Sequence, residues 1–100
     1  MPLDPDAYVE AVLALVERVP PGRVTTYGTL ADAVGEGGPR KVGRVMSLHG
    51  GSVPWWRVVR ADGSLPPSHD DEAHAHYREE GTPLTRTGRM DMAAAWFGDF

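Results

Sequence analysis

Two adjacent tryptophans, Trp55 and Trp56, are the residues whose type and spacing most suggest a binding chemistry. On an extended segment neighbouring side chains point to opposite sides, so only one of the two indoles can pack against the same surface. Tryptophan is usually mostly buried, and a purely structural role for the pair is the alternative. If one indole packs against the protein, the other is free to stack on a planar group such as a nucleic-acid base.

Other residues that could do chemistry lack the necessary partners or spacing. The 100 residues include no cysteine, which excludes disulfides, thiolate metal sites and cysteine nucleophiles. His74 lies two residues from His76 and five from His69, so no pair has the spacing of helical metal ligands. The acidic run Asp70–Glu72 suits the first turn of a helix. We therefore expect no catalytic residues, no metal and no cofactor.

The basic residues are concentrated in one part of the chain. The net charge of −4 argues against binding to nucleic acid, but the stretch from Arg23 to Arg60 carries six basic residues and two acids. That stretch has a charge of +4 and the remainder a charge of −8. Phosphate backbones attract such a cationic segment, so the charge distribution favours a nucleic-acid-binding element there.

The elements that would position these residues begin with a scaffold helix from Asp4 to Val19. Its apolar residues recur three and four apart, Asp4 can cap it, Pro5 suits its first position, and Pro20–Gly22 ends it. Thr26 is the expected N-cap of a second helix, Tyr27–Val34.

A helix-turn-helix is predicted next. The glycine-rich turn Gly35–Gly38 separates Tyr27–Val34 from a third helix, Pro39–His49, which begins with a proline and carries Arg40, Lys41 and Arg44 on its first turns. Gly43 is unfavourable inside a helix, which suggests close approach by another backbone or by a ligand.

The segment after this helix predicts a small β wing. Val53–Val59 has the composition of a strand, and Ala61–Ser64 has that of a hairpin turn. Ser68 and Asp71 form a capping-box pattern for a helix from Asp70 to Glu80, ended by Gly81.

In the tail, Asp91 is a candidate cap for a last short helix, and Trp96 and Phe97 are expected to return to the core. The predicted fold is mainly α, a winged-helix or helix-turn-helix DNA-binding domain with a small β wing, formed as one domain by residues 1–100. The N-terminus lacks a secretory signal, and no apolar run approaches membrane-spanning length. We expect a cytoplasmic, nucleoid-associated monomer with no membrane partner.

Three motifs together resemble the C-terminal, DNA-binding domain of the O6-alkylguanine-DNA alkyltransferases. They are Arg23–Ala31, Arg40–Met46 and Pro54–Val59, and the resemblance covers about positions 5 to 65. Trp55 stands where that family has its acceptor cysteine, and Trp56 stands where it has the activating histidine. A chain with tryptophan at the cysteine position resembles the alkyltransferase-like proteins.

The resemblance implies a function and a set of residues. It implies a non-enzymatic sensor that binds O6-alkylguanine in double-stranded DNA, flips the nucleotide and signals to nucleotide excision repair without alkyl transfer. Tyr27 would rotate the target nucleotide, Arg40 would fill the vacated stack, and the recognition helix would lie in the minor groove. The implied lesion-pocket residues are Tyr27, Met46, Trp55 and Val58. The implied DNA-binding residues are Thr26, Tyr27, Arg40, Lys41, Arg44, Ser47, Arg57 and Arg60.

Independent chemistry agrees, because dealkylation needs a thiolate and an indole is not a comparable nucleophile. The alternative function is a winged-helix transcriptional regulator that reads sequence through the Arg40 helix. An enzyme that uses histidine or acidic residues is disfavoured by their spacing.

Overall fold

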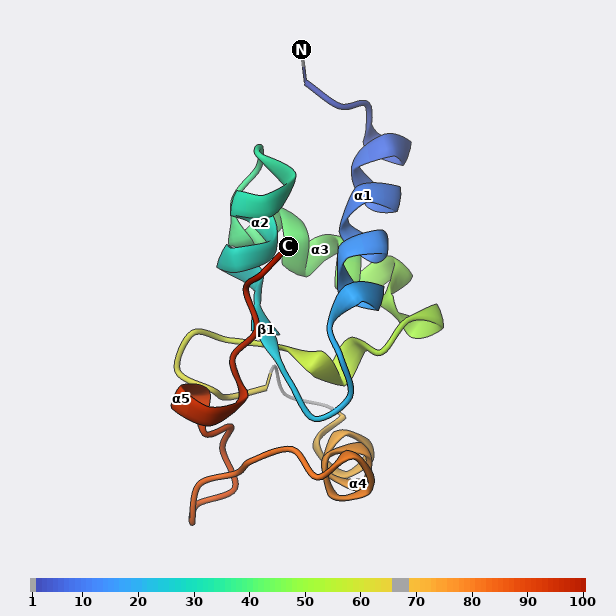
Figure 1. Cartoon of the computed structure of the whole chain (residues 1–100). Helices are drawn as coiled ribbons and strands as arrows, with labels where there is room; N and C mark the ends of the chain where they lie inside the picture. The colour runs from blue at the N-terminus through green and yellow to red at the C-terminus, as the bar shows by residue number, and fades with distance from the viewer. Residues whose placement is uncertain (1, 66–68) are drawn as a thin grey trace.

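The computed structural model describes residues 2–65 and 69–100, and the described chain is mainly helical with a two-stranded sheet, as predicted (Figure 1). The molecule is elongated, with extents of 44, 24 and 19 Å. Among the described residues, no helix is both long and apolar enough to cross a membrane. The elements in chain order are α1 (Pro5–Arg18), β1 (Thr25–Thr26), α2 (Tyr27–Val34), α3 (Pro39–His49), the 3-10 turns η1 (Gly50–Ser52) and η2 (Trp55–Arg57), β2 (Val58–Val59), α4 (Asp70–Glu80) and α5 (Met92–Ala95).

The scaffold helix α1 begins where the sequence predicts. The Asp4 side chain accepts a hydrogen bond from the Ala7 amide at 2.8 Å, which satisfies one of the free donors of the first turn. Its buried face repeats every four residues through Tyr8, Val12 and Val16. The helix ends at Arg18, one residue earlier than expected.

Helices α2 and α3 form the predicted helix-turn-helix with the predicted bounds. Thr26 caps α2 by accepting a hydrogen bond from the Thr29 amide at 3.0 Å. Gly35 ends α2 with φ of 91°, in the left-handed region that favours glycine. The two helices bury Leu30 and Ala31 against Val42 and Val45, so packing of apolar faces fixes the position of α3.

The predicted β wing is wrong in its extent and pairing. Only Val58 and Val59 form a strand, because the 3-10 turn of η2 occupies the three residues before them. This strand pairs in parallel with β1, Thr25 opposite Val58 and Thr26 opposite Val59. The expected turn exists, with the Arg60 amide donating to the Ser64 carbonyl, but it leads into no second wing strand within the described residues.

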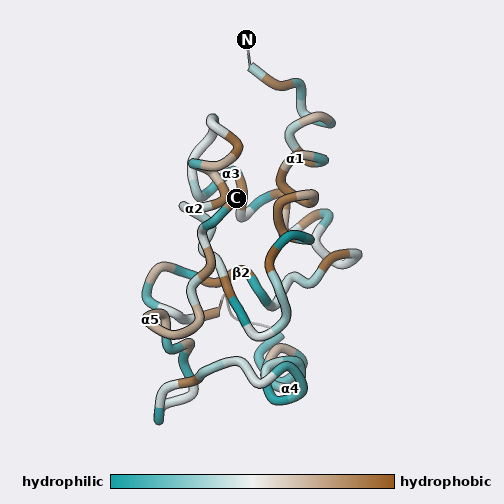
Figure 2. The backbone as a smooth tube through the Cα atoms, in the orientation of Figure 1, coloured by the Kyte–Doolittle hydropathy of each residue, from teal (hydrophilic) through white to brown (hydrophobic). Residues whose placement is uncertain are grey.

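The small sheet lies between two apolar cores. Successive strand residues point to opposite faces, so Val58 packs with the helices α1, α2 and α3 while Val59 packs with α4 and the tail. Both valines are almost fully buried, which gives β2 a central position rather than that of an exposed wing. Figure 2 shows the hydrophobic residues gathered on α1 and around the sheet, whereas α4 is mostly hydrophilic.

Helix α4 has the predicted bounds and ends at Gly81, which is left-handed with φ of 70°. The predicted cap Ser68 lies outside the described residues, and His69 is the N-cap position, without a side-chain cap bond. Ala73 and Tyr77, on the inner face of α4, are buried in the second core.

The C-terminal segment docks through its backbone, which corrects the expected place of Trp96. The Val24 amide donates to the Ala95 carbonyl at 2.9 Å, and the Phe97 amide donates to the Val24 carbonyl at 2.7 Å. Ala95 takes the buried position, so the neighbouring Trp96 is 47% exposed and Phe97 is half-buried. Asp91 stands at the N-cap of α5 but makes no side-chain cap bond.

Candidate nucleic-acid interface

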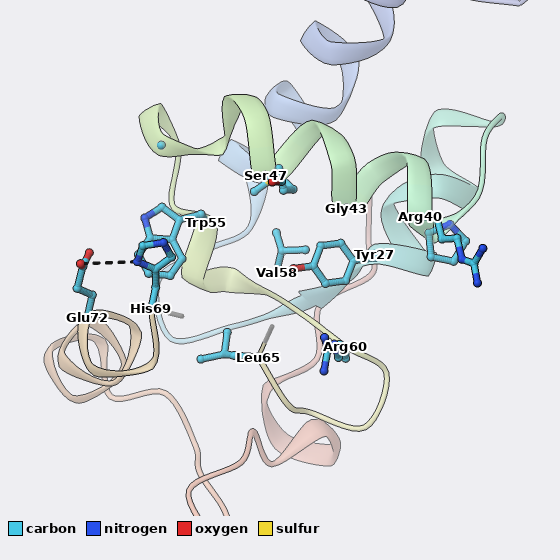
Figure 3. Close-up of a pocket in the computed structure, with 13 residues that line it drawn as sticks. Tyr27, Arg40, Gly43, Ser47, Trp55, Val58, Arg60, Leu65, His69 and Glu72 are labelled. Atoms are coloured by element: carbon cyan, nitrogen blue, oxygen red, sulfur yellow. Dashed lines mark ion pairs between the residues drawn. The ribbon is translucent and has the colours of Figure 1, made fainter. Parts of the chain in front are cut away.

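A pocket of about 880 Å³ opens between α3, β2 and the start of α4 (Figure 3). The four residues proposed from sequence for a lesion pocket all line it, although they come from four different elements: Tyr27, Met46, Trp55 and Val58. The pocket lies where the two apolar cores meet, because Tyr27 packs against the first and Trp55 against the second. Their contact with a lesion stays a prediction.

Tyr27, the first residue of α2, occupies the middle of the pocket (Figure 3). Its ring passes over Gly43 of α3, and a Cβ placed there would lie 4.0 Å from the ring. This is an ordinary van der Waals contact with a side chain and not the close approach of a backbone, and approach by a ligand at Gly43 stays a prediction. Burial raises the pKa of Tyr27, and the nearby Arg60 charge offsets only part of this rise. The phenol therefore stays protonated at neutral pH and can donate a hydrogen bond.

The two tryptophans have different surroundings, as the sequence predicts, although they lie on a 3-10 turn rather than an extended strand. Trp55 lines the pocket. Trp56 is half-buried and packs on α4, where its Nε1 donates to Glu80 at 3.0 Å and its ring stacks on His76 with centroids 3.5 Å apart. The two indoles meet edge to face at 5.6 Å. Trp55 is thus the indole that a ligand in the pocket can contact.

The predicted cations are distributed over several sides of this region. Arg40 and Arg60 are exposed and line the pocket, while Arg44 is exposed on α3 without lining it. Ser47 is also exposed on the pocket side of α3. Lys41 turns toward α1, with its Nζ 4.1 Å from the centre of the Tyr8 ring. The positive charge closest to the pocket is therefore that of Arg40 and Arg60.

Arg57 lies in the protein interior, so we remove it from the expected DNA-binding set. Its guanidinium forms a bidentate pair with Glu80, at 2.6 and 3.1 Å, and donates to the Val19 carbonyl at 3.0 Å. Only 13% of its side chain is exposed. Thr26 is likewise committed locally, because its hydroxyl caps α2 and bonds the Thr29 hydroxyl at 2.8 Å. Sequence alone gave no sign of the pairing between Arg57 and Glu80.

Several lining residues escaped the sequence analysis. They are Pro39, Gly51, Leu65, His69 and Glu72. The sequence placed Glu72 in the first turn of a helix and gave His69 no role as a metal ligand, but the His69 ring lies 5.7 Å from that of Trp55, and its Nδ1 is 3.8 Å from Glu72 Oε1.

The pocket can hold a planar group beside a polyanion. The pocket volume is in the usual range of roughly 300–1,000 Å³ for small-molecule sites. Aromatic and apolar side chains form most of its lining, and arginines stand at its edge. The described residues hold no group of three or more histidine, aspartate or glutamate side chains that could bind a metal ion. The lining offers stacking surfaces and no thiol nucleophile.

The comparisons with known proteins agree on one family. The model of the 6-O-methylguanine DNA methyltransferase, DNA binding domain, matches residues 7–82. The DNA base-flipping protein of Vibrio parahaemolyticus is 29% identical over 92 residues, covering 87% of this chain and 92% of that protein. The DNA base-flipping protein of Escherichia coli (strain K12) is 30% identical over 92 residues, covering 87% of this chain and 71% of that protein.

A solved structure extends the similarity to three dimensions. It is the crystal structure of S. pombe Atl1 in complex with damaged DNA containing O6-carboxymethylguanine. The TM-score is 0.79 at 28% sequence identity, and the match covers 95% of this chain and 99% of the Atl1 chain.

Proposed function

The chain belongs to the family of the 6-O-methylguanine DNA methyltransferase DNA-binding domain, and from this membership we propose that it is a non-enzymatic base-flipping protein that binds O6-alkylguanine in double-stranded DNA. The observation that carries the proposal is the pocket bounded by Tyr27 and Trp55 and lined by the exposed Arg40 and Arg60. It offers an extruded base an aromatic wall at the position where the resembled enzymes have a cysteine.

The geometry supports extrusion of the base from the duplex. A modified guanine pairs poorly, so removing it from the stack costs less than the few kcal/mol needed for an intact pair. Tyr27 stands in the pocket with a protonated hydroxyl that can donate to a phosphate oxygen. Arg40 is exposed at one end of the pocket, where its side chain can fill the space that the base leaves in the stack (Figure 3).

The same residues allow retention of the lesion but not its repair. Transfer of an alkyl group from O6 needs a strong nucleophile, and the chain has no cysteine to provide a thiolate. Trp55 supplies an apolar face at that position, and stacking on a base contributes about 1–3 kcal/mol. The lesion is therefore bound intact, and a separate pathway must remove it. We assign that removal to nucleotide excision repair, which the protein would recruit. The protein would act as a monomer on the nucleoid DNA in the cytoplasm.

A mobility-shift experiment tests the binding function. Two duplexes of identical sequence, with and without a single O6-methylguanine, are compared, and the pair is repeated in a second unrelated sequence. A base-flipping sensor prefers the lesion in both sequences. A preference that follows the surrounding sequence and ignores the lesion would instead support the transcriptional regulator that reads sequence through Arg40.

Mass spectrometry of the same mixtures tests the absence of chemistry. After incubation with an equal amount of lesion DNA, we expect an unmodified protein mass and an intact O6-methylguanine. Methylated protein or restored guanine would contradict the non-enzymatic function.

A further inference from the structure

The Glu80 carboxylate, at the end of α4, is one of the most completely bonded side-chain groups among the described residues. Its Oε1 accepts hydrogen bonds from the Gly22 amide at 3.2 Å and from Arg57 Nε at 3.1 Å. Its Oε2 accepts from Trp56 Nε1 at 3.0 Å and from Arg57 Nη2 at 2.6 Å. A carboxylate has about four lone-pair sites, so these four bonds occupy its acceptor capacity. With only 12% of its side chain exposed, Glu80 acts inside the protein.

The four donors belong to the two segments that lead to the aromatic walls of the pocket. Gly22 lies in the turn before β1, and β1 is followed directly by Tyr27. Arg57 and Trp56 belong to η2, whose first residue is Trp55. One carboxylate therefore connects the segment that presents Tyr27 to the segment that presents Trp55.

Two further contacts from α4 hold the same turn. The buried Tyr77 hydroxyl donates to the Trp56 carbonyl, and burial raises the pKa of Tyr77 so that it remains a donor. The ring of His76 lies parallel to the Trp56 indole, with an angle of 4° between the planes. Trp56 is thus fixed at its ring edge, its ring face and its backbone, and its direct neighbour in the chain is Trp55.

We propose that Glu80 is a positioning residue of the lesion pocket, which holds Trp55 and Tyr27 at the separation that accepts an extruded O6-alkylguanine. This inference rests on the proposed function. It assigns to the last turns of α4 a role in lesion selectivity, although Glu80 does not line the pocket. The exposed cations that attract the DNA backbone do not depend on these bonds, so selectivity and general DNA affinity should separate.

The variant Glu80→Gln tests the proposal, because the amide keeps the shape of the side chain but turns donor hydrogens toward Arg57 and toward either Gly22 or Trp56. The matched control is Glu79→Gln, which removes the same charge from the neighbouring, exposed position of α4. Affinities for duplexes with and without O6-methylguanine are measured well below the melting temperature of each variant. We expect Glu80→Gln to reduce the preference for the lesion by about tenfold, which corresponds to losing part of one stacking contact. The affinity for unmodified DNA should change by less than about twofold. Glu79→Gln should keep both values.

A second variant covers the case in which Glu80→Gln does not fold. Tyr77→Phe removes only the hydroxyl that holds the Trp56 carbonyl, and we expect a smaller reduction of the preference in the same direction. A folded Glu80→Gln protein with wild-type preference overturns the positioning role, as does an unfolded one combined with an unaltered preference in Tyr77→Phe. A wild-type protein that shows no preference for the lesion contradicts the proposed function instead, so the two failures are distinguishable.

Discussion

Trp55 and Tyr27 line the same pocket. Their roles differ, and single substitutions can separate them. Tyr27 directly follows β1 and Trp55 lies three residues before β2, and because the strands are parallel these two positions are at opposite ends of the sheet. Both rings are half-buried, so each has a face toward the protein and a face toward the pocket. The aromatic surface of the pocket is therefore rigidly supported rather than presented on a free loop.

Replacement of Trp55 by alanine should lower lesion affinity more than general DNA affinity. Loss of a base-stacking contact worth about 1–3 kcal/mol corresponds to a reduction of roughly 5- to 150-fold in lesion affinity. Affinity for unmodified DNA should persist because the exposed arginines carry it. Trp55→Phe, which retains an aromatic face, is the control and should keep most of the preference. A large fall in melting temperature with unchanged preference would make Trp55 a core residue.

Arg40 and Arg44 lie one helical turn apart on α3, but only Arg40 lines the pocket. Arg40→Ala should therefore reduce the preference for the lesion, because the space left by the extruded base is no longer filled. Arg44→Ala should weaken binding to lesion and unmodified duplexes equally. Both residues are exposed, so neither variant should shift the melting temperature appreciably. Equal preference in the two variants would remove the intercalating role of Arg40.

At the scale of the elements, α2 depends on its cap. Thr26 supplies the side-chain acceptor for the Thr29 amide, and this helix starts with the residue that enters the pocket. Thr26→Ala should destabilise the protein by about 1 kcal/mol and lower its melting temperature by roughly 4–8 °C. Thermal unfolding followed by circular dichroism measures this. Thr26→Ser, which keeps the hydroxyl, should restore most of the loss.

Helix α4 makes the stability of the protein sensitive to acid through Glu80. Burial raises the pKa of this carboxyl, but the hydrogen bonds from Arg57, Gly22 and Trp56 outweigh burial and leave its pKa below the ordinary value. The ionised group thus stabilises the folded state fully above the unfolded pKa of about 4.3, and this contribution is lost as the pH falls through the lower folded pKa.

Denaturant unfolding at several pH values tests this dependence. We expect the wild-type free energy of unfolding to decrease below about pH 4 through this group, and we expect Glu80→Gln to show a smaller decrease. The exposed Glu79→Gln variant should follow the wild-type profile. Parallel profiles for wild type and Glu80→Gln would contradict the assignment.

Over the whole molecule, charge is segregated along the elongated shape. The surface of α3 and the pocket edge carry exposed cations, whereas α4 begins with three acidic residues. The protein as a whole has a charge of −4, so binding to DNA depends on how it is oriented and not on its total charge. DNA that enters the pocket thus meets Arg40 of α3 on one side and Glu72, from the acidic start of α4, on the other.

Salt dependence measures how many cations contact the backbone. The logarithm of the binding constant should fall against the logarithm of salt concentration with a slope of about −0.9 for each phosphate neutralised. Arg44→Ala should reduce the magnitude of that slope by about one such unit. Arg86→Ala is the control, since Arg86 is exposed in the segment between α4 and α5, at the far end of the molecule from α3 (Figure 1). An unchanged slope in Arg44→Ala would exclude the face of α3 from contact with DNA.

The helices could be predicted from the sequence because they depend on interactions over a few residues. Hydrogen bonds in a helix join residues four apart, and caps such as Asp4 and Thr26 act within three, so periodicity and cap residues predicted α1 to α4 almost to the residue. The absence of cysteine, the paired tryptophans and the three motifs that resemble the alkyltransferases were equally readable, since they need only residue identity.

Contacts between residues far apart in the sequence could not be predicted and were found only in three dimensions. Arg57 was assigned to DNA by its charge, but its guanidinium pairs with Glu80, 23 residues away, and with the carbonyl of Val19, 38 residues away. The same holds for β2, which pairs with β1 across the helix-turn-helix rather than with a neighbouring wing strand, and for Trp96, whose exposure follows from the burial of Ala95 beside it. Local sequence sets the cost of forming each element, whereas burial and hydrogen bonding between elements select the pairing, and these depend on all segments at once.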